Sequence, residues 1–232
     1  MTVLLEVKNL CKRYNKKIVL DSVSFSVDKG KIVGLLGENG AGKTTLLKII
    51  AGFSKPTSGQ VLINNTKVGI ETRRYVAFLP DTVLFPKWMK VKDALKFFAD
   101  FYDDFDLSKV KDMLKFLNIN ENGNIHDFSR GTIEKFSVAL LLSRNVNLYL
   151  LDEPLAFIDP ISRDVVINMI LDNLSGEKTI IVSTNIIFEI EHIFDEVIIL
   201  KDGKIELIDS TENLREKSGV SVNQFFKEGG TK

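Results

Sequence analysis

Residues 37–45 read Gly-Glu-Asn-Gly-Ala-Gly-Lys-Thr-Thr, and this run constrains the fold more than any other part of the chain. It fits the pattern G-x-x-x-x-G-K-[ST] of a loop that cradles phosphate groups. The apolar run 31–36 before it predicts a buried strand, and residues 46–51 after it predict a helix that stops at Gly52. Strand, glycine loop and helix is the context that the motif needs. A plain glycine turn is the alternative, and it would not require every fixed position of the motif to be filled.

The chemistry expected of this loop is the binding of an anion. Gly37, Gly40 and Gly42 let the backbone curl so that its N–H groups point inward. The helix that begins near Lys43 adds the positive end of its dipole. Lys43 supplies a full charge for the outer phosphates, and the hydroxyl of Thr44 can ligate magnesium. We therefore expect a nucleotide to contact Gly37, Glu38, Asn39, Gly40, Ala41, Gly42, Lys43, Thr44 and Thr45.

Composition sets the limits of the interpretation. With 232 residues, 44% apolar and 27% charged, the chain predicts one large globular domain or a core with a subdomain. The formal net charge is zero, so bulk electrostatics give no reason to expect nucleic acid or anionic lipid as a partner. The single Cys11 excludes an internal disulfide and fits a reducing compartment. No signal peptide is evident, and apolar runs such as 138–142 are too short to span a bilayer, so we expect any membrane role to come through a partner chain.

The first third of the chain has the two-residue period of strands. We expect strands at 4–10, 23–27 and 75–79 and a small hairpin over 61–68, because apolar residues alternate there and turn residues separate them. The basic run 12–17 is expected to be a loop.

From about residue 86 to 145 the pattern changes to the helical period, which predicts a helical subdomain inserted into the strand-rich core. Its aromatic residues are four apart, at Phe97, Phe101 and Phe105 and at Phe98 and Tyr102, and we expect them to mark one face of a single helix. The apolar residues Val110, Leu114 and Leu117 mark the next helix in the same way. Packing within the subdomain is one explanation of the aromatic stripe, and an exposed groove for a partner helix is the other. The loop residues Phe85, Trp88 and Met89 are better candidates for such a groove.

The second half alternates helices and strands. An apolar run at 148–151 predicts a buried strand, and helix, strand and helix follow at 160–174, 179–183 and 186–192. Asp202-Gly203 predicts a tight hairpin, and the tail from Thr211 is expected to be helical before it frays at Gly229-Gly230. Strands that alternate with helices favour a sheet with a parallel centre.

Two acids end the strand at 148–151. Asp152 could hold magnesium through a water molecule, and Glu153 could orient or deprotonate an attacking water. The alternative is that both residues simply terminate the strand. The phosphate loop about 110 residues upstream favours the functional interpretation, because the acids complete the set needed for phosphoryl transfer.

At this point the chain resembles the ATP-binding cassette (ABC) proteins, the ATPase subunits of ABC transporters, over nearly its whole length. The resemblance is carried by residues 37–45 as Walker A, by 148–153 as Walker B with its glutamate, and by 158–160 as the D-loop. The stretch 128–132 is similar to the family signature Leu-Ser-Gly-Gly-Gln in weakened form. Ser129 and Gly131 match it, whereas Phe128, Arg130 and Thr132 do not.

The resemblance implies an α/β fold: a P-loop nucleoside triphosphate hydrolase core with a parallel-centred sheet, an N-terminal antiparallel β subdomain and an inserted helical subdomain. Within one cassette domain over 1–232, the core is expected at 1–85 and 146–210, the helical subdomain at 86–145 and a helical tail at 211–232.

The resemblance also implies a head-to-tail dimer, either of two identical chains or of two different cassettes. ATP would lie between Walker A of one subunit and Ser129 and Gly131 of the other. Tyr14 falls where the family stacks an aromatic ring on adenine, and an ordinary surface tyrosine is the alternative.

Two switch positions of the family are also substituted. Asn185 stands where the family has a histidine, and the two histidines of the chain, His126 and His192, lie elsewhere. Asp81 stands where the family has a glutamine, and its carboxylate can ligate magnesium directly. Asparagine can donate one hydrogen bond but cannot become cationic. We therefore expect tight binding of magnesium-ATP and slow but measurable hydrolysis.

These inferences lead to a set of expected roles. Lys43, Glu153 and Asn185 are the expected catalytic residues, and Thr44, Asp81 and Asp152 are the expected magnesium ligands. The leading hypothesis is an ATPase that docks on a separate integral membrane permease, in the cytoplasm on the inner face of the cell membrane. A nucleotide-dependent clamp or regulator, and a GTPase or small-molecule kinase, are the alternatives. The chain has no Asn-Lys-x-Asp element for reading guanine, which disfavours the GTPase.

Overall fold

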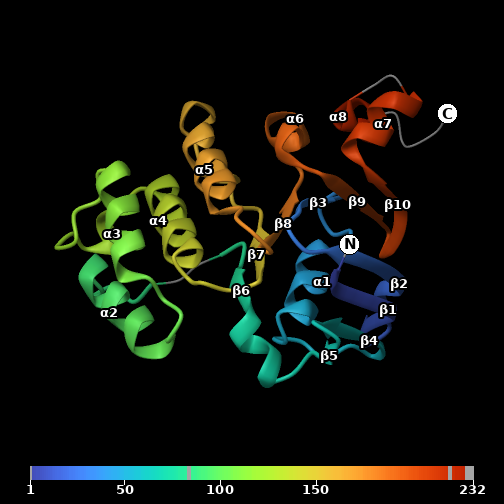
Figure 1. Ribbon diagram of the computed structural model, residues 1–232, viewed down its shortest axis with the longest axis horizontal. Coiled ribbons are helices and arrows are strands. Elements are labelled where there is room, and N and C mark those ends of the chain that lie inside the picture. The colour runs from blue at the N-terminus through green and yellow to red at the C-terminus, as the bar shows by residue number, and fades with distance from the viewer. Residues whose placement is uncertain (1, 83–84, 219–220, 228–232) are drawn as a thin grey trace.

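The structure, a computed structural model, describes residues 2–82, 85–218 and 221–227. Two sheets enclose one helix, and further helices cover the outer face of the larger sheet (Figure 1). The expected fraying at Gly229-Gly230 lies outside the described residues.

The larger sheet has six strands in the order β10-β9-β3-β8-β7-β6. All its neighbouring pairs are parallel except β9 and β10, which are antiparallel, so the predicted parallel centre is confirmed. Its middle strands are buried on both faces, which explains their continuous apolar runs. The strands are β3 (Ile32–Leu36), β6 (Val76–Leu79), β7 (Leu148–Asp152), β8 (Thr179–Thr184), β9 (Glu196–Lys201) and β10 (Lys204–Ser210).

The smaller sheet is antiparallel and has the order β2-β1-β4-β5. It consists of β1 (Val3–Tyr14), β2 (Lys17–Asp28), β4 (Ser58–Ile63) and β5 (Thr66–Lys67). The predicted hairpin over 61–68 is confirmed, and Asn64 and Asn65 both have positive φ at its turn, 48° and 60°.

The expectation of a basic loop over 12–17 was wrong. Residues 12–14 continue β1 and Lys17 already begins β2, because Arg13 pairs with Ile18 and Tyr14 with Lys17. The turn is only two residues long, and Asn15 within it has φ 52°. Basic side chains do not prevent strand pairing at an edge where one face meets solvent.

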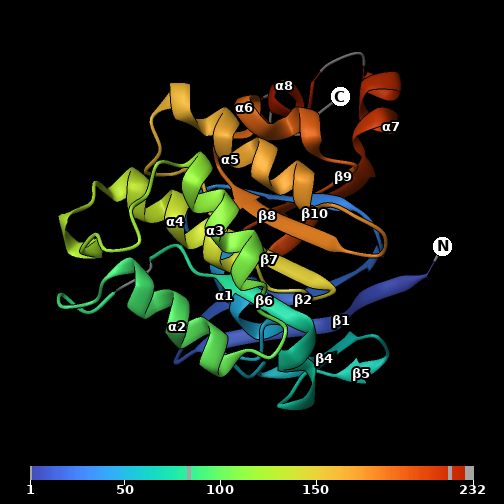
Figure 2. The ribbon, with the colours of Figure 1, turned by 60° about the vertical axis from the view of Figure 1, so that its left-hand side comes forward.

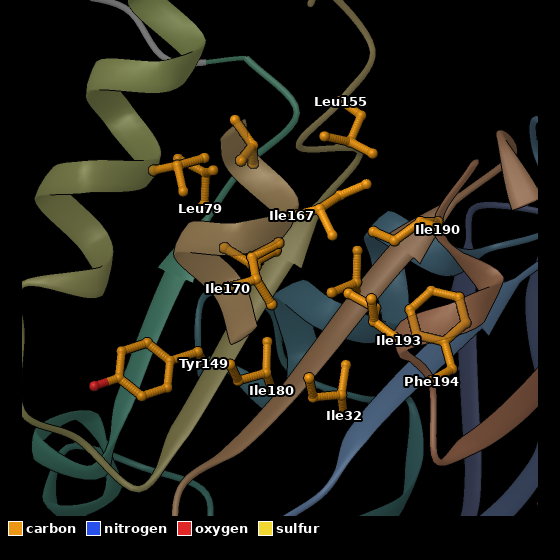
Figure 3. Close-up of a cluster of buried hydrophobic side chains, with 14 of the residues drawn as sticks. Ile32, Leu79, Tyr149, Leu155, Ile167, Ile170, Ile180, Ile190, Ile193 and Phe194 are labelled. Atoms are coloured by element: carbon orange, nitrogen blue, oxygen red, sulfur yellow. The ribbon is translucent and has the colours of Figure 1, made fainter. Parts of the chain in front are cut away.

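Side chains on alternate positions of the central strands enter two different cores. Val33 and Leu35 of β3 face helix α1 (Lys43–Ile50) and the smaller sheet, whereas Ile32 and Leu36 face the opposite side. On that side Ile32 and Ile180 point from the strands towards Ile167 and Ile170, whereas the ring of Tyr149 extends sideways with its hydroxyl directed away from them (Figure 3). Those two isoleucines belong to α5 (Pro160–Asn173), which begins with the side chain of Asp159 capping its first turn. In Figure 2, α5 and α4 lie side by side over this face of the sheet.

A third core belongs to the predicted helical region. It contains α2 (Val91–Phe101), α3 (Leu107–Phe116) and α4 (Arg130–Leu142), which lie together at one end of the molecule (Figure 1). The aromatic stripe divides between the two explanations. Phe98, Tyr102 and Phe105 pack on one another, whereas Phe97 and Phe101 are 47% and 69% exposed and stack with their ring centroids 4.5 Å apart.

The placement of Phe105 on the same helix as Phe97 was wrong. Helix α2 ends at Phe101, and Tyr102 after it is extended, with φ −125°. Phe105 instead forms an isolated bridge with Arg144 and still contacts the ring of Phe98. A spacing of four residues therefore brought these rings together without a continuous helix.

Short elements complete the fold. A 3-10 turn spans Glu71–Tyr75, so the strand expected at 75–79 begins one residue later, at Val76. Another 3-10 turn spans Ile125–Asp127. The helix expected at 186–192 is α6 (Ile187–Ile190) followed by a 3-10 turn over Glu191–Ile193. The tail is helical as expected, with α7 (Thr211–Ser218) and α8 (Val222–Lys227). No helix in the described part of the chain is both long enough and apolar enough to cross a membrane.

Candidate active site

The glycine loop connects the end of β3 to the start of α1. Gly42 precedes α1 with φ 110°, a conformation that glycine adopts without strain. A Cβ atom there would meet the side chain of Leu20 and the carbonyl of Val19 at 2.9 Å, so the loop also lacks space for another residue. No side chain caps α1, and the N–H groups of its first turn are therefore available to an anion.

The side chain of Lys43 lies along this loop and is nearly fully buried, with 5% of the residue exposed. Its Nζ donates to the carbonyl oxygens of Gly37 at 2.8 Å and Glu38 at 3.4 Å. It also forms an ion pair with Glu153, with Nζ 3.2 Å from Oε1. The ammonium group is thus held over the loop by groups that a phosphate could replace.

Asp152 ends β7 and is fully buried. Oδ1 accepts a hydrogen bond of 2.5 Å from the hydroxyl of Ser183, but Oδ2 has no partner among the described residues. Burial raises the pKa of Asp152, and the nearby hydroxyls of Ser183 and Thr44 act in the opposite direction. A buried carboxylate oxygen without a donor, beside a threonine hydroxyl, suits a divalent cation.

Asp81 is close enough for its charge to raise the pKa of Asp152 further. Asp81, Thr44 and Glu153 line one open cavity of about 300 Å³, together with residues of the glycine loop. Within the described ranges no three Asp, Glu, His or Cys side chains converge as a metal cluster. The carboxylates of Asp152 and Asp81 and the hydroxyl of Thr44 fit magnesium, which binds through one or two carboxylates and takes its other ligands from water and phosphate.

Glu153 has φ 52°, a strained conformation for a residue other than glycine. Its N–H is near both the carbonyl oxygen and the hydroxyl of Ser183, each at 3.1 Å, and these contacts fix the strained backbone. The carboxylate is shared between Lys43 and the N–H of Asn185, which donates to Oε2 at 3.2 Å. Burial raises the pKa of Glu153, while the charge of Lys43 lowers it.

Asn185 lies between the strand end and the glycine loop. Its Nδ2 donates to Oδ1 of Asn39 at 3.3 Å, while its backbone holds Glu153. The structure therefore brings Lys43, Glu153 and Asn185 together, although they are far apart in sequence. Ser183 was missed by the sequence analysis. The available signal was a polar residue within a buried strand. Ser183 contacts both acids: its hydroxyl donates to Asp152 and accepts from the N–H of Glu153.

The other expected nucleotide contacts lie outside this cavity. Ser129 is exposed and caps α4, with its Oγ accepting from the N–H of Thr132 at 3.1 Å. Neither Ser129 nor Gly131 lines the cavity described above, and nor does Tyr14. Tyr14 is 48% exposed, and the Nζ of Lys12 lies 4.6 Å from the centroid of its ring.

A second residue missed from sequence is Glu134, which is only 7% exposed on the first half of α4. Burial raises its pKa to about 7; the charge of Arg130 lowers this pKa, and that of Asp81 raises it. The sequence signal for Glu134 was its place just before an apolar helical run. A residue one turn inside a helix can face the core, even when it is charged. Glu134 links the start of α4 electrostatically to the Asp81 segment.

Comparison with known proteins gives consistent results. The sequence pattern of the ABC transporter family matches residues 20–156. The ABC transporter ATP-binding protein YxlF of Bacillus subtilis (strain 168) is 31% identical over 225 residues, which cover 94% of this chain and 75% of YxlF.

Solved structures with the same fold include the ATP-binding subunit of an ABC transporter, with a TM-score of 0.89 and 28% identity, covering 98% of this chain and 100% of that one. The dimeric structure of MJ0796, a bacterial ABC transporter cassette, has a TM-score of 0.79 at 23% identity, covering 89% of this chain and 98% of that one.

Glu134 should make the stability of the fold depend on pH. The pKa of Glu134 is about 7 in the folded chain, against an ordinary value of 4.5. The folding stability that its protonated form contributes is therefore fully present below about pH 4.5 and is lost as the pH rises through 7. We expect Glu134→Gln to raise the free energy of unfolding by about 1–3 kcal/mol near pH ~8 and by much less near pH ~5. Urea unfolding at both pH values measures this, with the exposed Glu71→Gln as control. An equal effect at both values would contradict the assignment.

Proposed function

The chain belongs to the ABC transporter family, and from this premise we propose that two such cassettes, pairing around ATP, drive a separate integral membrane permease. The observation that carries the proposal is the convergence of Lys43, Asp152 and Glu153 at the mouth of one phosphate-binding loop. One cation at a helix start and two acids at a strand end are the groups that ATP hydrolysis needs.

We assign the phosphates of ATP to the loop Gly37–Thr45, which provides N–H groups and the positive end of α1. Arrival of the triphosphate gives Lys43 a stronger anionic partner than Glu153, with which it pairs at 3.2 Å. Glu153 is then free to accept a proton from an attacking water, and Asn185 keeps its carboxylate in place.

Magnesium, when bound, would neutralise charge that develops on the transferred phosphoryl group. Thr44 and Asp152 would hold it, and Asp81 would add a second carboxylate from the neighbouring strand. The unpartnered Oδ2 of Asp152 supports this assignment.

The pairing of two cassettes is supported by the position of Ser129 and Gly131, outside the cavity that the glycine loop lines. If they contact ATP, as the family resemblance implies, they do so from a second chain. MJ0796, which shares the fold, forms a dimer. The second chain could be identical to this one or a different cassette, and the weak catalytic features described next favour a more active companion.

We infer that hydrolysis is slow, because Asn185 supplies a neutral donor where the family has a histidine. Its amide already bonds Asn39 on the glycine loop, so it can reach the phosphates from its present position. It cannot place positive charge there. Tyr14 remains our candidate for stacking on adenine. If the base stacks on the face of the ring that Lys12 covers, the side chain of Lys12 must first move away.

An apolar groove supports the permease as a partner. A cavity of about 370 Å³ lies between the end of β6 and α2, and its lining includes Phe78, Pro80, Phe85, Met89 and Phe97. Phe85 and Met89 thus line the groove as expected, whereas Trp88 is 69% exposed and is not among the lining residues. We propose that a cytoplasmic helix of the permease binds there, which would place the chain on the inner face of the membrane. A clamp or regulator without a membrane partner would leave this groove unused.

ATP binding tests the proposal directly. Lys43→Ala should lower magnesium-dependent ATP affinity by about a hundredfold or more, because it removes the buried cation of the loop. Glu153→Gln should keep the affinity and accumulate an ATP-bound dimer, measured by equilibrium binding and light scattering. Lys48→Ala, on the same helix but in its last turn, is the matched control. Unchanged affinity in Lys43→Ala would sink the proposal.

The role of Asn185 is tested by restoring the family residue. We expect Asn185→His to speed single-turnover hydrolysis by about tenfold to a hundredfold, because a donor near the γ-phosphate gains positive charge. The double variant with Glu153→Gln should remain inactive. If Asn185→His is no faster than the native chain, this position does not limit the rate.

Docking on the permease is tested at the groove. Phe97→Asp should reduce retention of the chain by membrane vesicles of its source cells about tenfold, because it places a charge in an apolar contact. ATP binding by the purified variant should not change. Phe116→Asp is the matched control, since Phe116 is 64% exposed on α3 and does not line the groove. Equal retention of both variants would argue against docking at this groove.

A further inference from the structure

The strongest unassigned feature is the side chain of Arg163, near the start of α5. Its guanidinium is largely buried, with 13% of the side chain exposed. Nε donates to the carbonyl oxygen of Ile158 at 3.0 Å, and Nη1 forms an ion pair with Oε1 of Glu189. Breaking a largely buried ion pair is costly, so these contacts fix the segments that carry the two partners. One side chain thus joins α5, the loop after β7 and α6.

The first partner, Ile158, ends the tight loop 154–158 that follows Glu153. Its side chain is only 2% exposed, so this end of the loop is anchored in the core. At the other end the carbonyl oxygen of Glu153 accepts from the N–H of Ala156 at 3.1 Å. Because the loop is short and tightly turned, a displacement of Ile158 would be transmitted to Glu153. The contact from Arg163 therefore also restrains Glu153.

The second partner, Glu189, belongs to the short helix that follows Asn185. Helix α6 has four residues, and a helix of about one turn has little stability of its own. Its position therefore depends on contacts with the rest of the chain. Ile187 and Ile190 supply apolar contacts in the core, and Glu189 supplies the ion pair with Arg163.

Both restrained segments meet at one hydrogen bond of the site. The N–H of Asn185 donates to Oε2 of Glu153 at 3.2 Å. Glu153 begins the loop that Arg163 fixes at Ile158, and Asn185 precedes the helix that Arg163 fixes at Glu189. Arg163 itself is not among the residues that line the cavity of the glycine loop. Any effect it has on a reaction there must pass through these two segments.

We propose that Arg163 is a positioning residue for ATP hydrolysis, which ties α6 to the loop after Glu153 and so keeps Asn185 at the Glu153 carboxylate. This rests on the proposed function, in which Glu153 accepts a proton from the attacking water. An arginine suits the task, because its planar guanidinium holds two acceptors in fixed directions at once. Without the tie, Asn185 and Glu153 keep their chemical groups but lose their relative placement, and a displacement of about 1 Å can cost roughly a hundredfold in rate.

Single-turnover hydrolysis and ATP affinity, measured on the same variants, test the proposal. We expect Arg163→Met to slow hydrolysis about tenfold to a hundredfold and to change the affinity for magnesium-ATP less than about twofold, because the glycine loop is untouched. Arg163→Lys, which keeps the charge but not the fork, should lose less. Arg215→Met is the matched control, since Arg215 is exposed on α7 and does not line the cavity. It should hydrolyse ATP at the native rate.

The route through Glu189 is tested by a double-variant cycle. Glu189→Leu should slow hydrolysis by a similar factor, and adding Arg163→Met to it should slow hydrolysis little further. Reversal of the pair, with Arg163→Glu and Glu189→Arg in one chain, should recover part of the rate.

Hydrogen exchange gives a measure of placement that does not depend on activity. In Arg163→Met, the amides of residues 186–190 should exchange about tenfold faster, whereas those of β3 should exchange as in the native chain, because the released contact is local. A residue that only stabilises the fold would instead speed exchange in both segments and give additive losses of rate.

The outcomes separate this inference from the proposed function. A native rate in Arg163→Met, or a loss of rate that reflects only weaker ATP binding, would overturn the role of Arg163 and leave the proposed ATPase intact. Faster exchange throughout the fold would also overturn it, since the loss of rate would then follow from general destabilisation. A native chain that did not bind magnesium-ATP, or did not hydrolyse it, would overturn the proposed function and this inference with it.

Discussion

The parallel pairing of β3, β7 and β8 is the constraint on which the site depends. In a parallel sheet all carboxyl ends emerge at the same edge, so the glycine loop, the two acids and Asn185 meet there although about 150 residues separate the first from the last. The register is specific: Leu36 lies beside Thr184, and Asp152 lies beside Ser183. A shift of one residue would turn Asp152 to the other face and remove it from the hydroxyl that orients it.

The ion pair between Lys43 and Glu153 determines how the site behaves before a nucleotide arrives. Both side chains are largely buried, and a buried charge that loses its partner is costly. Each residue therefore stabilises the other until a phosphate replaces the carboxylate. In the proposed mechanism, the same exchange that would hold ATP would also release Glu153 and so couple the presence of substrate to the availability of the base. The strained backbone of Glu153, fixed through Ser183, keeps the released carboxylate close to the loop.

Sequence was sufficient where a local pattern determines structure. The buried runs of β3, β7 and β8, the glycine loop and the Asp202-Gly203 turn, with φ 47° and 76°, all follow from nearby residues. Sequence was insufficient where contacts between residues distant in the chain determine the local structure. The basic residues 12–14 become strand because β2 pairs with them, and Phe105 leaves the helix because Arg144 bridges to it. Glu134 and Ser183 had only weak sequence signals, because what singles them out is burial together with the charge of Asp81 near Glu134 and the hydrogen bond from Ser183 to Asp152.

The charges around the glycine loop support the proposal that one chain alone forms an incomplete site. Glu38, Asp81 and Glu153 line the cavity and Asp152 lies beside it, whereas Lys43 is the only basic residue in that lining. Such an excess of acid repels a triphosphate, and the dipole of α1 offsets only about half an elementary charge. A divalent cation held by the acids would reverse the local field, but it would leave the outer phosphate oxygens without donors. In the proposed pairing these donors would come from the second chain, in which Ser129 is exposed at the start of α4. In the proposed dimer, the excess of acid around the glycine loop of one chain would face the positive end of α4 in the other, with the nucleotide and its metal between them.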